Sequence, residues 1–291
     1  MKKLSPRMML VMSMTVFGTI GLFIRNIPLP TGEIALYRAV LAGLLIAGYL
    51  LIRGQKLDFN SMKKQLPVLL LSGVAMGINW ILLFEAYRYT TVSVATLSYY
   101  FAPVIVTVAS PLLFREKLTP KQILCFVMST VGLVMITVSG DMSKGGTDLL
   151  GILLGLGAAC FYASVVLMNK FVQGIDGIQR TFVQFIGAIV VLVPYVLCTN
   201  GVNLDQLQTM GWICLLVIGL VHTGITYCMY FSALKDLPGQ KAAILSYVDP
   251  LVAVLVSVVL LHEPMSMLQI FGGLLILGFT LWNELSGTKE A

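Results

Sequence analysis

An acidic residue interrupts one of the most apolar stretches of the chain. Residues 242–263 read AAILSYVDPLVAVLVSVVLLHE, with Asp249 and Pro250 near the middle. An acidic residue at membrane depth costs about 2.5 to 3.5 kcal/mol on insertion scales, so Asp249 is expected to face the protein interior beside a partner. Its carboxyl group is a candidate for proton coupling or for binding a substrate amine. The alternative is a structural role, in which the acid caps a backbone carbonyl that Pro250 leaves free.

Polar and aromatic residues recur at mid-depth in other apolar stretches. His222, Thr226 and Tyr230 follow each other at spacings of four and therefore share one face of a helix. Singly, such residues more often join helices than bind ligands. Together they predict a cavity for a small, partly apolar molecule. The predicted cavity residues are Asn79, Trp80, Tyr99, His222, Thr226, Tyr230, Tyr247, Arg38 and Glu85.

A charged group is expected near one face of the membrane. Glu85 and Arg88 are three residues apart and can pair on one helix face. Arg38 lies about a turn and a half inside its apolar segment and needs a carboxylate or carbonyl oxygens nearby. With Arg25 and Glu33, these residues form either an ion-pair network at the helix ends or part of a substrate site, and the sequence leaves both interpretations open.

The sequence predicts no enzyme activity, no metal site and no cofactor. His262 and Glu263 lack the second histidine of a zinc hydrolase, and the chain has only 2 histidines. Gly155 and Gly157 lie inside an apolar segment, which argues against a dinucleotide-binding loop. The 5 cysteines lie in apolar segments without paired spacing and are expected to be inert thiols.

The elements that position these residues are membrane helices. With 58% hydrophobic and only 11% charged residues, the chain is far from the composition of soluble proteins. A bilayer core about 30 Å thick needs roughly 20 helical residues. The predicted segments are 8–25, 33–52, 67–87, 91–113, 120–138, 149–170, 181–199, 210–232, 240–261 and 266–284.

The distribution of positive residues predicts the orientation. With the amino terminus in the cytoplasm, most of the 19 Lys and Arg residues fall on the cytoplasmic side. We therefore expect a multi-pass protein of the cytoplasmic (plasma) membrane with both termini in the cytoplasm. The apolar residues 8–24 have no small-residue cleavage site after them and are expected to form an uncleaved helix, the alternative being a secretory signal.

An internal repeat relates the two halves. A shift of 147 positions pairs Ala95 with Ala242, Pro103 with Pro250 and Glu116 with Glu263. Five helices per half is an odd number, so the halves must be inverted, with the polar residues 139–148 as the junction and predicted domains 1–141 and 142–291. Pro103 and Pro250, each expected near the centre of a helix, are candidate hinges; two structural kinks are the alternative.

These features resemble the EamA family of the drug/metabolite transporter superfamily. The resemblance is carried by LLFEAYRYTTVSVATLSYYFAPV (82–104), FREKLTPKQ (114–122), YFSALKDLPGQKAAILSYVDPLVAVL (230–255) and LHEPMSMLQIFGG (261–273), and it covers nearly the whole chain. It implies an all-α membrane protein of ten helices in two inverted five-helix repeats around a central cavity. The third, fourth, eighth and ninth helices are expected to contribute much of the lining.

The leading hypothesis is therefore a secondary transporter of small metabolites, of the amino acid type and working as an exporter. A facilitated exchanger of sugars or phosphorylated metabolites is the alternative, and a lipid-handling or non-transport membrane protein is more remote. The expected partners are a small-molecule substrate, the lipid bilayer and protons, but no nucleic acid. The sequence leaves open whether the protein is a monomer or a homodimer.

Overall fold

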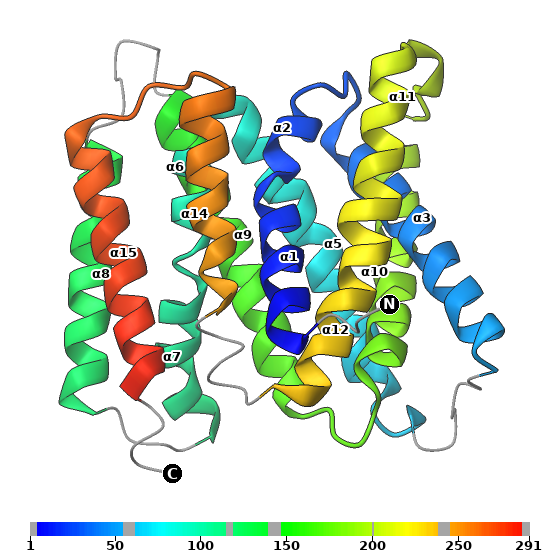
Figure 1. The fold of residues 1–291 in the computed structure, drawn as a ribbon, viewed down its shortest axis with the longest axis horizontal. Helices are drawn as coiled ribbons and strands as arrows, with labels where there is room; N and C mark the ends of the chain where they lie inside the picture. Colours follow the sequence, from blue (N-terminus) through cyan, green and yellow to red (C-terminus); the bar gives the residue numbers. More distant parts are fainter. Residues whose placement is uncertain are drawn as a thin grey trace.

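The protein folds into a bundle of ten apolar helical segments. The computed structural model describes residues 5–54, 62–114, 119–138, 147–199, 201–237 and 245–286. Within these residues, 8 helical segments are long and apolar enough to cross a membrane, and two shorter ones span Val248–Leu260 and Met267–Asn283. Figure 1 shows all of them running between the same two ends of the molecule. This arrangement confirms the predicted all-helical membrane fold with ten helices.

The first half contributes five segments, some of them made of two helices. Ser5 accepts a hydrogen bond from the Met8 amide and so caps the first helix, and Thr91 caps the fourth segment in the same way at the Val94 amide. The elements are α1 (Pro6–Gly18) with α2 (Ile20–Ile24), α3 (Thr31–Ile52), α5 (Leu66–Tyr89), α6 (Val92–Tyr99) with α7 (Ala102–Phe114), and α8 (Pro120–Val138).

The second half repeats this pattern, with two π-helical segments that the sequence did not predict. The seventh segment of the chain begins at residue 177 instead of the predicted 181. Asp176 accepts the Ile178 amide at 3.1 Å and so caps the helix before its polar first turn. The elements are α9 (Thr147–Lys170), α10 (Gly177–Thr199), the short turn η2 (Leu204–Gln206), α11 (Thr209–Leu216) with π-helical η3 (Val217–Ile225) and α12 (Thr226–Asp236), α14 (Val248–Leu255) with π-helical η4 (Val256–Leu260), and α15 (Met267–Ser286).

The two repeated prolines lie at helix starts. The chain breaks between α6 and α7 at Tyr100, and Pro103 lies in the first turn of α7. The second break is at Tyr247, directly before α14, and Pro250 lies in that first turn. The expectation of prolines inside continuous helices is therefore wrong, because a residue without an amide hydrogen is best placed in a first turn, where no helical acceptor is needed.

The two halves run in opposite directions through the molecule. In Figure 1, α6 and α7 descend from the upper to the lower end, whereas α14 ascends. α1 begins and α15 ends at the lower end. The predicted junction at residues 139–148 lies mostly outside the described residues.

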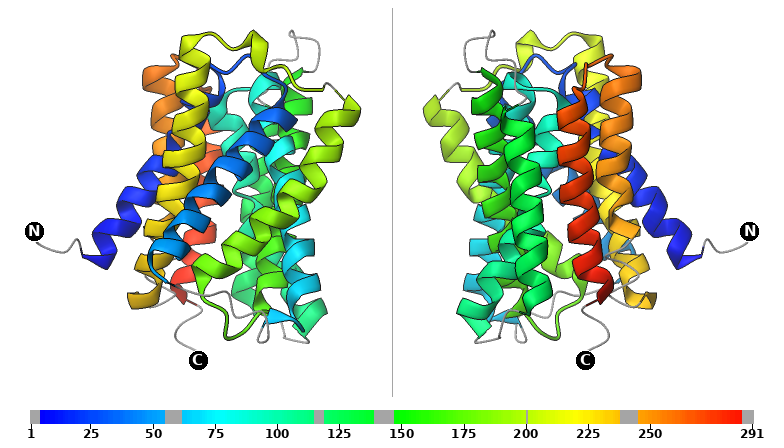
Figure 2. Two further views of the ribbon diagram at one scale, coloured as in Figure 1. Left: turned by 90° about the vertical axis from the view of Figure 1, so that its right-hand side faces the viewer. Right: turned by 90° about the vertical axis from the view of Figure 1, so that its left-hand side faces the viewer.

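The core of the protein is the interface between its halves. The most extensive helix contacts pair α5 with α9 and α10, α8 with α15, and α3 with α10 and η3, and α1 packs against α12 and α14. The pairing of α8 with α15 is visible in the right-hand view of Figure 2. Gly132 and Gly272 lie at this crossing, and a Cβ atom on either would collide with the backbone carbonyl of the other. The halves therefore interdigitate and do not stand side by side.

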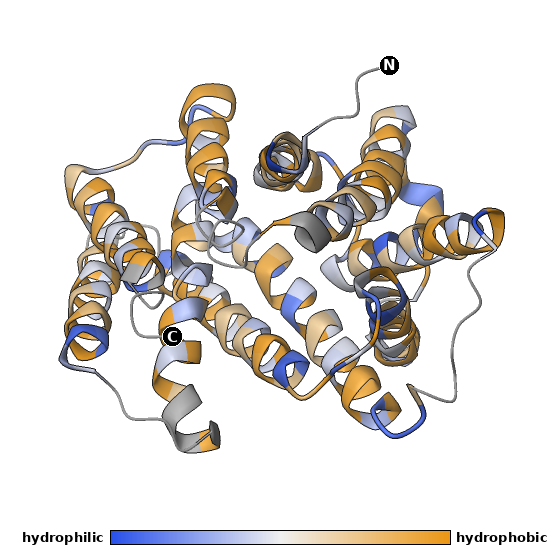
Figure 3. Ribbon diagram, turned by 60° about the horizontal axis from the view of Figure 1, so that its bottom comes forward, coloured by the Kyte–Doolittle hydropathy of each residue, from blue (hydrophilic) through white to orange (hydrophobic). Residues whose placement is uncertain are grey.

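The periphery is apolar, as a lipid-facing surface requires. Large hydrophobic side chains are exposed along the outer helices, and Figure 3 shows hydrophobic residues there and hydrophilic ones at loops and helix ends. Strongly exposed examples are Leu51, Ile52, Val138, Leu197, Met267 and Leu274.

Candidate functional site

Asp249 meets its partner at the break between α6 and α7. The Tyr100 hydroxyl donates a hydrogen bond to Asp249 Oδ2, at 2.6 Å between the oxygens. Tyr100 belongs to the first half of the chain and Asp249 to the second. On the opposite side, Gly18 of α1 packs against the Asp249 backbone carbonyl so closely that a Cβ atom there would lie 2.6 Å from the oxygen. The predicted interior partner is thus a phenol, and both halves fix the position of the acid.

Tyrosines from three helical segments surround this pair. The Tyr99 ring lies 5.8 Å from the Tyr100 ring and 5.4 Å from that of Tyr162 on α9, measured between centroids. The hydroxyl of Tyr162 is within electrostatic reach of Tyr227 and Tyr230 on α12 and of Asp249. We call these residues the central tyrosine cluster: Tyr99, Tyr100, Tyr162, Tyr227 and Tyr230.

The cluster keeps accessible surface although it lies between the halves. Tyr162 is 41% exposed, and Tyr99, Tyr100 and Asp249 are partly exposed. Sequence reasoning found Tyr99 and Tyr230 but missed Tyr100, Tyr162 and Tyr227, because tyrosines are common in membrane proteins and only the fold shows which of them converge.

Arg38 of α3 is a deeply buried cation held by aromatic rings. Its side chain is 5% exposed, and its guanidinium carbon lies 4.5 Å from the Trp80 centroid and 5.5 Å from that of Phe84. Its Nε donates to the Thr223 hydroxyl at 2.6 Å. Each cation–π contact is worth about 0.5 to 2 kcal/mol, so the rings offset much of the insertion cost. The expected carboxylate partner is not there: among the described residues, none lies within ion-pair distance of Arg38.

The π-helical segment η3 aims two polar side chains at the first half. His222 Nε2 lies 2.9 Å from the Thr19 hydroxyl oxygen, and the imidazole packs edge-on against Phe23. Thr223, the acceptor for Arg38, donates in turn to the carbonyl five residues back, which a π-helix leaves within reach. The widened turn therefore places Thr223 against α3 and His222 against the break between α1 and α2.

The predicted face of the eighth segment packs against α1 and α2. Besides His222, the Thr226 carbonyl lies 3.5 Å from the Ser13 hydroxyl oxygen, and the Tyr230 ring lies 6.4 Å from the Phe17 ring. Thr226 also donates its own hydroxyl to the backbone within η3. His222 and Thr226 therefore join helices in this structure, and Tyr230 belongs to the central tyrosine cluster.

The remaining predicted cavity residues have separate surroundings. Asn79 donates to the Ala158 carbonyl at 2.6 Å and ties α5 to α9. Trp80 packs between Arg38 and Phe185, at 5.6 Å between ring centroids for the latter. Tyr247 is buried at the second chain break. Glu85 accepts the Thr31 hydroxyl at 2.8 Å near the upper end, away from Asp249.

A polar network closes the upper end of the molecule, and it pairs different residues from those expected. Arg25 and Glu263 form an ion pair at 2.6 Å, and Glu263 also accepts the Val92 amide at 2.8 Å and the Ser257 hydroxyl. Arg25 donates further to the Thr90 carbonyl at 2.7 Å. We call Arg25, Thr90, Val92, Ser257 and Glu263 the upper-end network; it joins both halves.

The expected pairing of Glu85 with Arg88 does not form. Glu85 bonds to Thr31, and Arg88 donates to the Leu29 carbonyl. Glu33 is fully buried and accepts both the amide and the side-chain amino group of Asn203, at 2.9 and 2.6 Å. These side chains lock loops onto helix ends, in agreement with the structural interpretation of the charged group.

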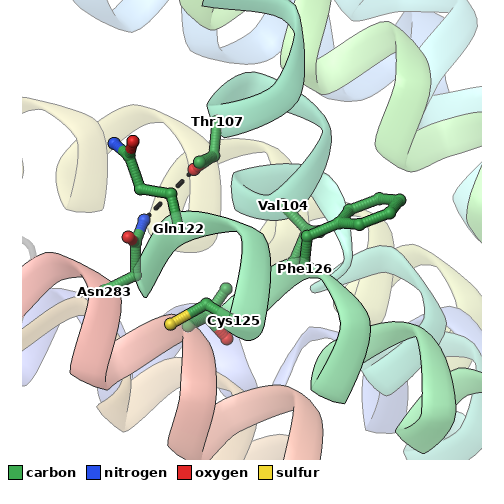
Figure 4. Close-up of a pocket in the computed structure, with 7 residues that line it drawn as sticks. Val104, Thr107, Gln122, Cys125, Phe126 and Asn283 are labelled. Atoms are coloured by element: carbon green, nitrogen blue, oxygen red, sulfur yellow. Dashed lines mark hydrogen bonds between the residues drawn. The ribbon is translucent and has the colours of Figure 1, made fainter. Parts of the chain in front are cut away.

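A small pocket lies apart from these groups, between α7, α8 and α15 (Figure 4). Its volume is about 10 Å³, the space of about one water molecule. Asn283 donates to the Thr107 hydroxyl across it at 3.2 Å, and Cys125 and Phe126 complete much of the wall. The pocket is too small for a metabolite.

Comparison with known proteins assigns both halves to the same family model. The model of the EamA-like transporter family matches residues 5–138 and again residues 149–283. A Bacillus subtilis protein named uncharacterized transporter YxxF is 28% identical over 272 residues, covering 91% of this chain and 86% of that protein. An uncharacterized transporter of Archaeoglobus fulgidus is 27% identical over 282 residues, covering 94% and 95%.

Two further similarities bear on substrate and fold. The Escherichia coli protein named biotin transporter is 24% identical over 250 residues, covering 85% of this chain and 81% of that protein. A solved crystal structure superposes with a TM-score of 0.69 at 15% identity, covering 98% of this chain and 97% of that one. The second similarity supports the arrangement of the helices.

Proposed function

The chain belongs to the EamA-like transporter family, and from this premise we propose that it is a secondary active transporter of small metabolites that works by alternating access. As a member of this family it is a multi-pass membrane transporter and not an enzyme. The substrate site that we propose is the central tyrosine cluster with Asp249, where the two halves meet.

The observation that carries this proposal is the hydrogen bond between Tyr100 and Asp249. It joins the two halves at the chain breaks that the internal repeat places in equivalent positions. An acid at the interface of inverted repeats feels any relative movement of the halves directly. We propose that Asp249 binds a proton or a substrate amine, and that the chain bends at Pro103 and Pro250 when the halves rock.

We further propose that the substrate is an amino acid or a related compound and that transport is outward. Tyrosine rings offer apolar walls with hydroxyl groups at their edges, which suits a small molecule with one apolar and one polar part. Asn79, Trp80, His222, Thr226, Tyr247 and Glu85 then hold the surrounding helices. In this proposal each repeat is one domain, 1–141 and 142–291. We also propose that both termini lie in the cytoplasm. Because α1 begins and α15 ends at the lower end of Figure 1, the upper end is then the outer end.

An exchanger of sugars or phosphorylated metabolites is the second candidate. Arg38 is the observation in its favour, because a buried cation attracts anions. A phosphate dianion beside Asp249 needs more positive charge than one guanidinium supplies. We therefore prefer a substrate with at most one negative charge.

Uptake into proteoliposomes tests the proposal. Purified protein is reconstituted with a pH gradient and offered a panel of labelled amino acids, biotin, sugars and sugar phosphates. We expect Asp249→Asn to abolish accumulation driven by the gradient, whereas the exposed Asp205→Asn leaves it unchanged. Accumulation by Asp249→Asn equal to that of the parent protein would refute proton coupling at Asp249, and movement of no solute at all would refute the transport proposal.

A further inference from the structure

We infer that Arg38 is the receptor for a carboxylate group of the substrate. This inference rests on the proposed function and narrows it to monoanionic or zwitterionic carboxylic acids. Its basis is a buried guanidinium that has aromatic rings beside it and, in the part of the chain that the structure describes, no acid within ion-pair distance.

The acids nearest in the fold and sequence are already occupied by other donors. Glu33 accepts the amide and side chain of Asn203, and Glu85 accepts the Thr31 hydroxyl. Asp249 accepts the Tyr100 hydroxyl, and Glu263 pairs with Arg25. Within the described part of the chain, Arg38 is therefore a buried cation without a counter-ion. A positive charge in such a place attracts an anion from outside the protein.

The contacts of the guanidinium leave its anion-binding edge available. The guanidinium carbon lies over the Trp80 and Phe84 rings, and Thr223 accepts from Nε. The two terminal amino groups have no protein acceptor among the described residues. A guanidinium presents these groups as a planar fork that matches the two oxygens of a carboxylate. The rings and Thr223 thus orient the side chain and leave the fork for a ligand.

Arg38 is connected to the proposed substrate site through aromatic rings. Trp80, which contacts Arg38, lies 5.6 Å from Phe185, and Phe185 lies 5.5 Å from Tyr227, measured between ring centroids. The central tyrosine cluster therefore has a basic group beyond Tyr227 and an acidic group, Asp249, at Tyr100. A carboxylate bound at Arg38 would place the rest of its molecule along these rings, with Asp249 disfavouring a second negative charge.

Trp80 provides a direct readout, because its ring contacts Arg38. The chain has 3 tryptophans, so the Trp212→Phe/Trp282→Phe protein reports from Trp80 alone. Purified full-length protein in nanodiscs is titrated with three carboxylic acids and their neutral amides: butyrate and butyramide, biotin and its amide, and N-acetyl-L-leucine and N-acetyl-L-leucinamide. We expect each acid that binds to do so at least about tenfold more tightly than its amide, as for loss of a hydrogen-bonded charge.

Variants assign the preference to Arg38. Arg38→Gln should bind acid and amide alike, and Arg38→Lys should recover part of the preference, because it keeps the charge without the fork. Arg53→Gln is the matched control, since Arg53 also lies over a ring, 5.6 Å from the Tyr49 centroid, but is exposed at the end of α3. It should retain the full preference.

The acid-to-amide comparison needs no variant, so it stands even if Arg38→Gln does not fold. Equal binding of acids and amides by the parent protein, binding of none of the six compounds, or an undiminished preference in folded Arg38→Gln would overturn the inference. Transport in the proteoliposome assay separates this outcome from failure of the proposed function. Neutral amides carried as fast as the acids would refute the Arg38 inference alone.

Discussion

Loss of the Glu263 carboxylate is expected to open the upper end of the protein, which we propose is the outer end. Glu263 accepts from Arg25, Val92 and Ser257, and its side chain is 10% exposed against 35% for Arg25. The Glu263→Gln substitution keeps the size of the side chain but removes its charge. The upper-end network joins the two halves in the conformation of this structure. Its weakening therefore destabilises this closed conformation, but not an open conformation in which these contacts are absent.

The size of this effect follows from the contacts. A hydrogen bond to a charged group is worth about 1.5 to 3 kcal/mol, and an exposed ion pair about 0.2 to 1 kcal/mol. Arg25 is partly exposed, so screening by water reduces the ion-pair share. A loss of about 2 kcal/mol corresponds to roughly a 30-fold increase in the ratio of outward-open to closed protein. Arg25→Gln should have a similar effect, and the double variant should add little to either one.

Cysteine accessibility measures the opening. Ser93 is fully buried next to the upper-end network, and its hydroxyl has no hydrogen-bond partner among the described residues. Ser93→Cys in a cysteine-free background therefore disturbs the structure little and reports when this site becomes accessible. A membrane-impermeant methanethiosulfonate added outside should label this cysteine about 30-fold faster in Glu263→Gln than in the parent. Glu85→Gln is the control, because Glu85 bonds to Thr31 within one half. Equal labelling rates in Glu263→Gln and the parent, or equal acceleration by Glu85→Gln, would refute this reasoning.

Three further predictions concern contacts between the halves. Gly18→Ala should lower the free energy of unfolding in detergent by about 1 to 3 kcal/mol, whereas Gly48→Ala should not, because a Cβ atom at Gly48 meets nothing within 4 Å. Asn79→Leu should cost about 0.5 to 1.5 kcal/mol in the same measurement by removing the hydrogen bond to the Ala158 carbonyl, which keeps only its donor within α9, and an unchanged midpoint would contradict this role. Tyr100→Phe should lower the initial rate of gradient-driven uptake at least about tenfold through loss of the hydrogen bond to Asp249, and a rate equal to the parent's would show that this bond is dispensable.

Hydropathy and the repeat predicted most of the fold. Most helix positions follow from apolar length alone, as for α8, whose bounds 120–138 agree with those predicted. The seventh segment is an exception, because its polar first turn begins at 177 instead of 181. The chain breaks were predicted only in part, since a proline marks a break but does not say on which side of it the helix ends. The π-helical turn of η3 had no visible signal, because it depends on how His222 and Thr223 meet the neighbouring helices.

Partners across helices were beyond the reach of sequence patterns. Spacing rules report only neighbours within one helix, which is why they favoured a pair between Glu85 and Arg88. In the fold, each of these residues has a closer partner on another segment. The same limit hid the bonds of Tyr100 with Asp249 and of Arg25 with Glu263. Glu263 did carry a signal, its repetition as Glu116, but nothing local identified Arg25.

The interdigitated core has a consequence for biosynthesis. The contacting surfaces of α1, α5 and α8 are completed by helices of the second half, so they have no partner while the ribosome is still making that half. Until the second half is inserted, the contact surfaces of the first five helices, including their small residues and Asn79, are therefore exposed to lipid or to the insertion machinery. A chain that stops at the junction should be recognised as incomplete and degraded. Co-synthesis of the two halves as separate chains should rescue both.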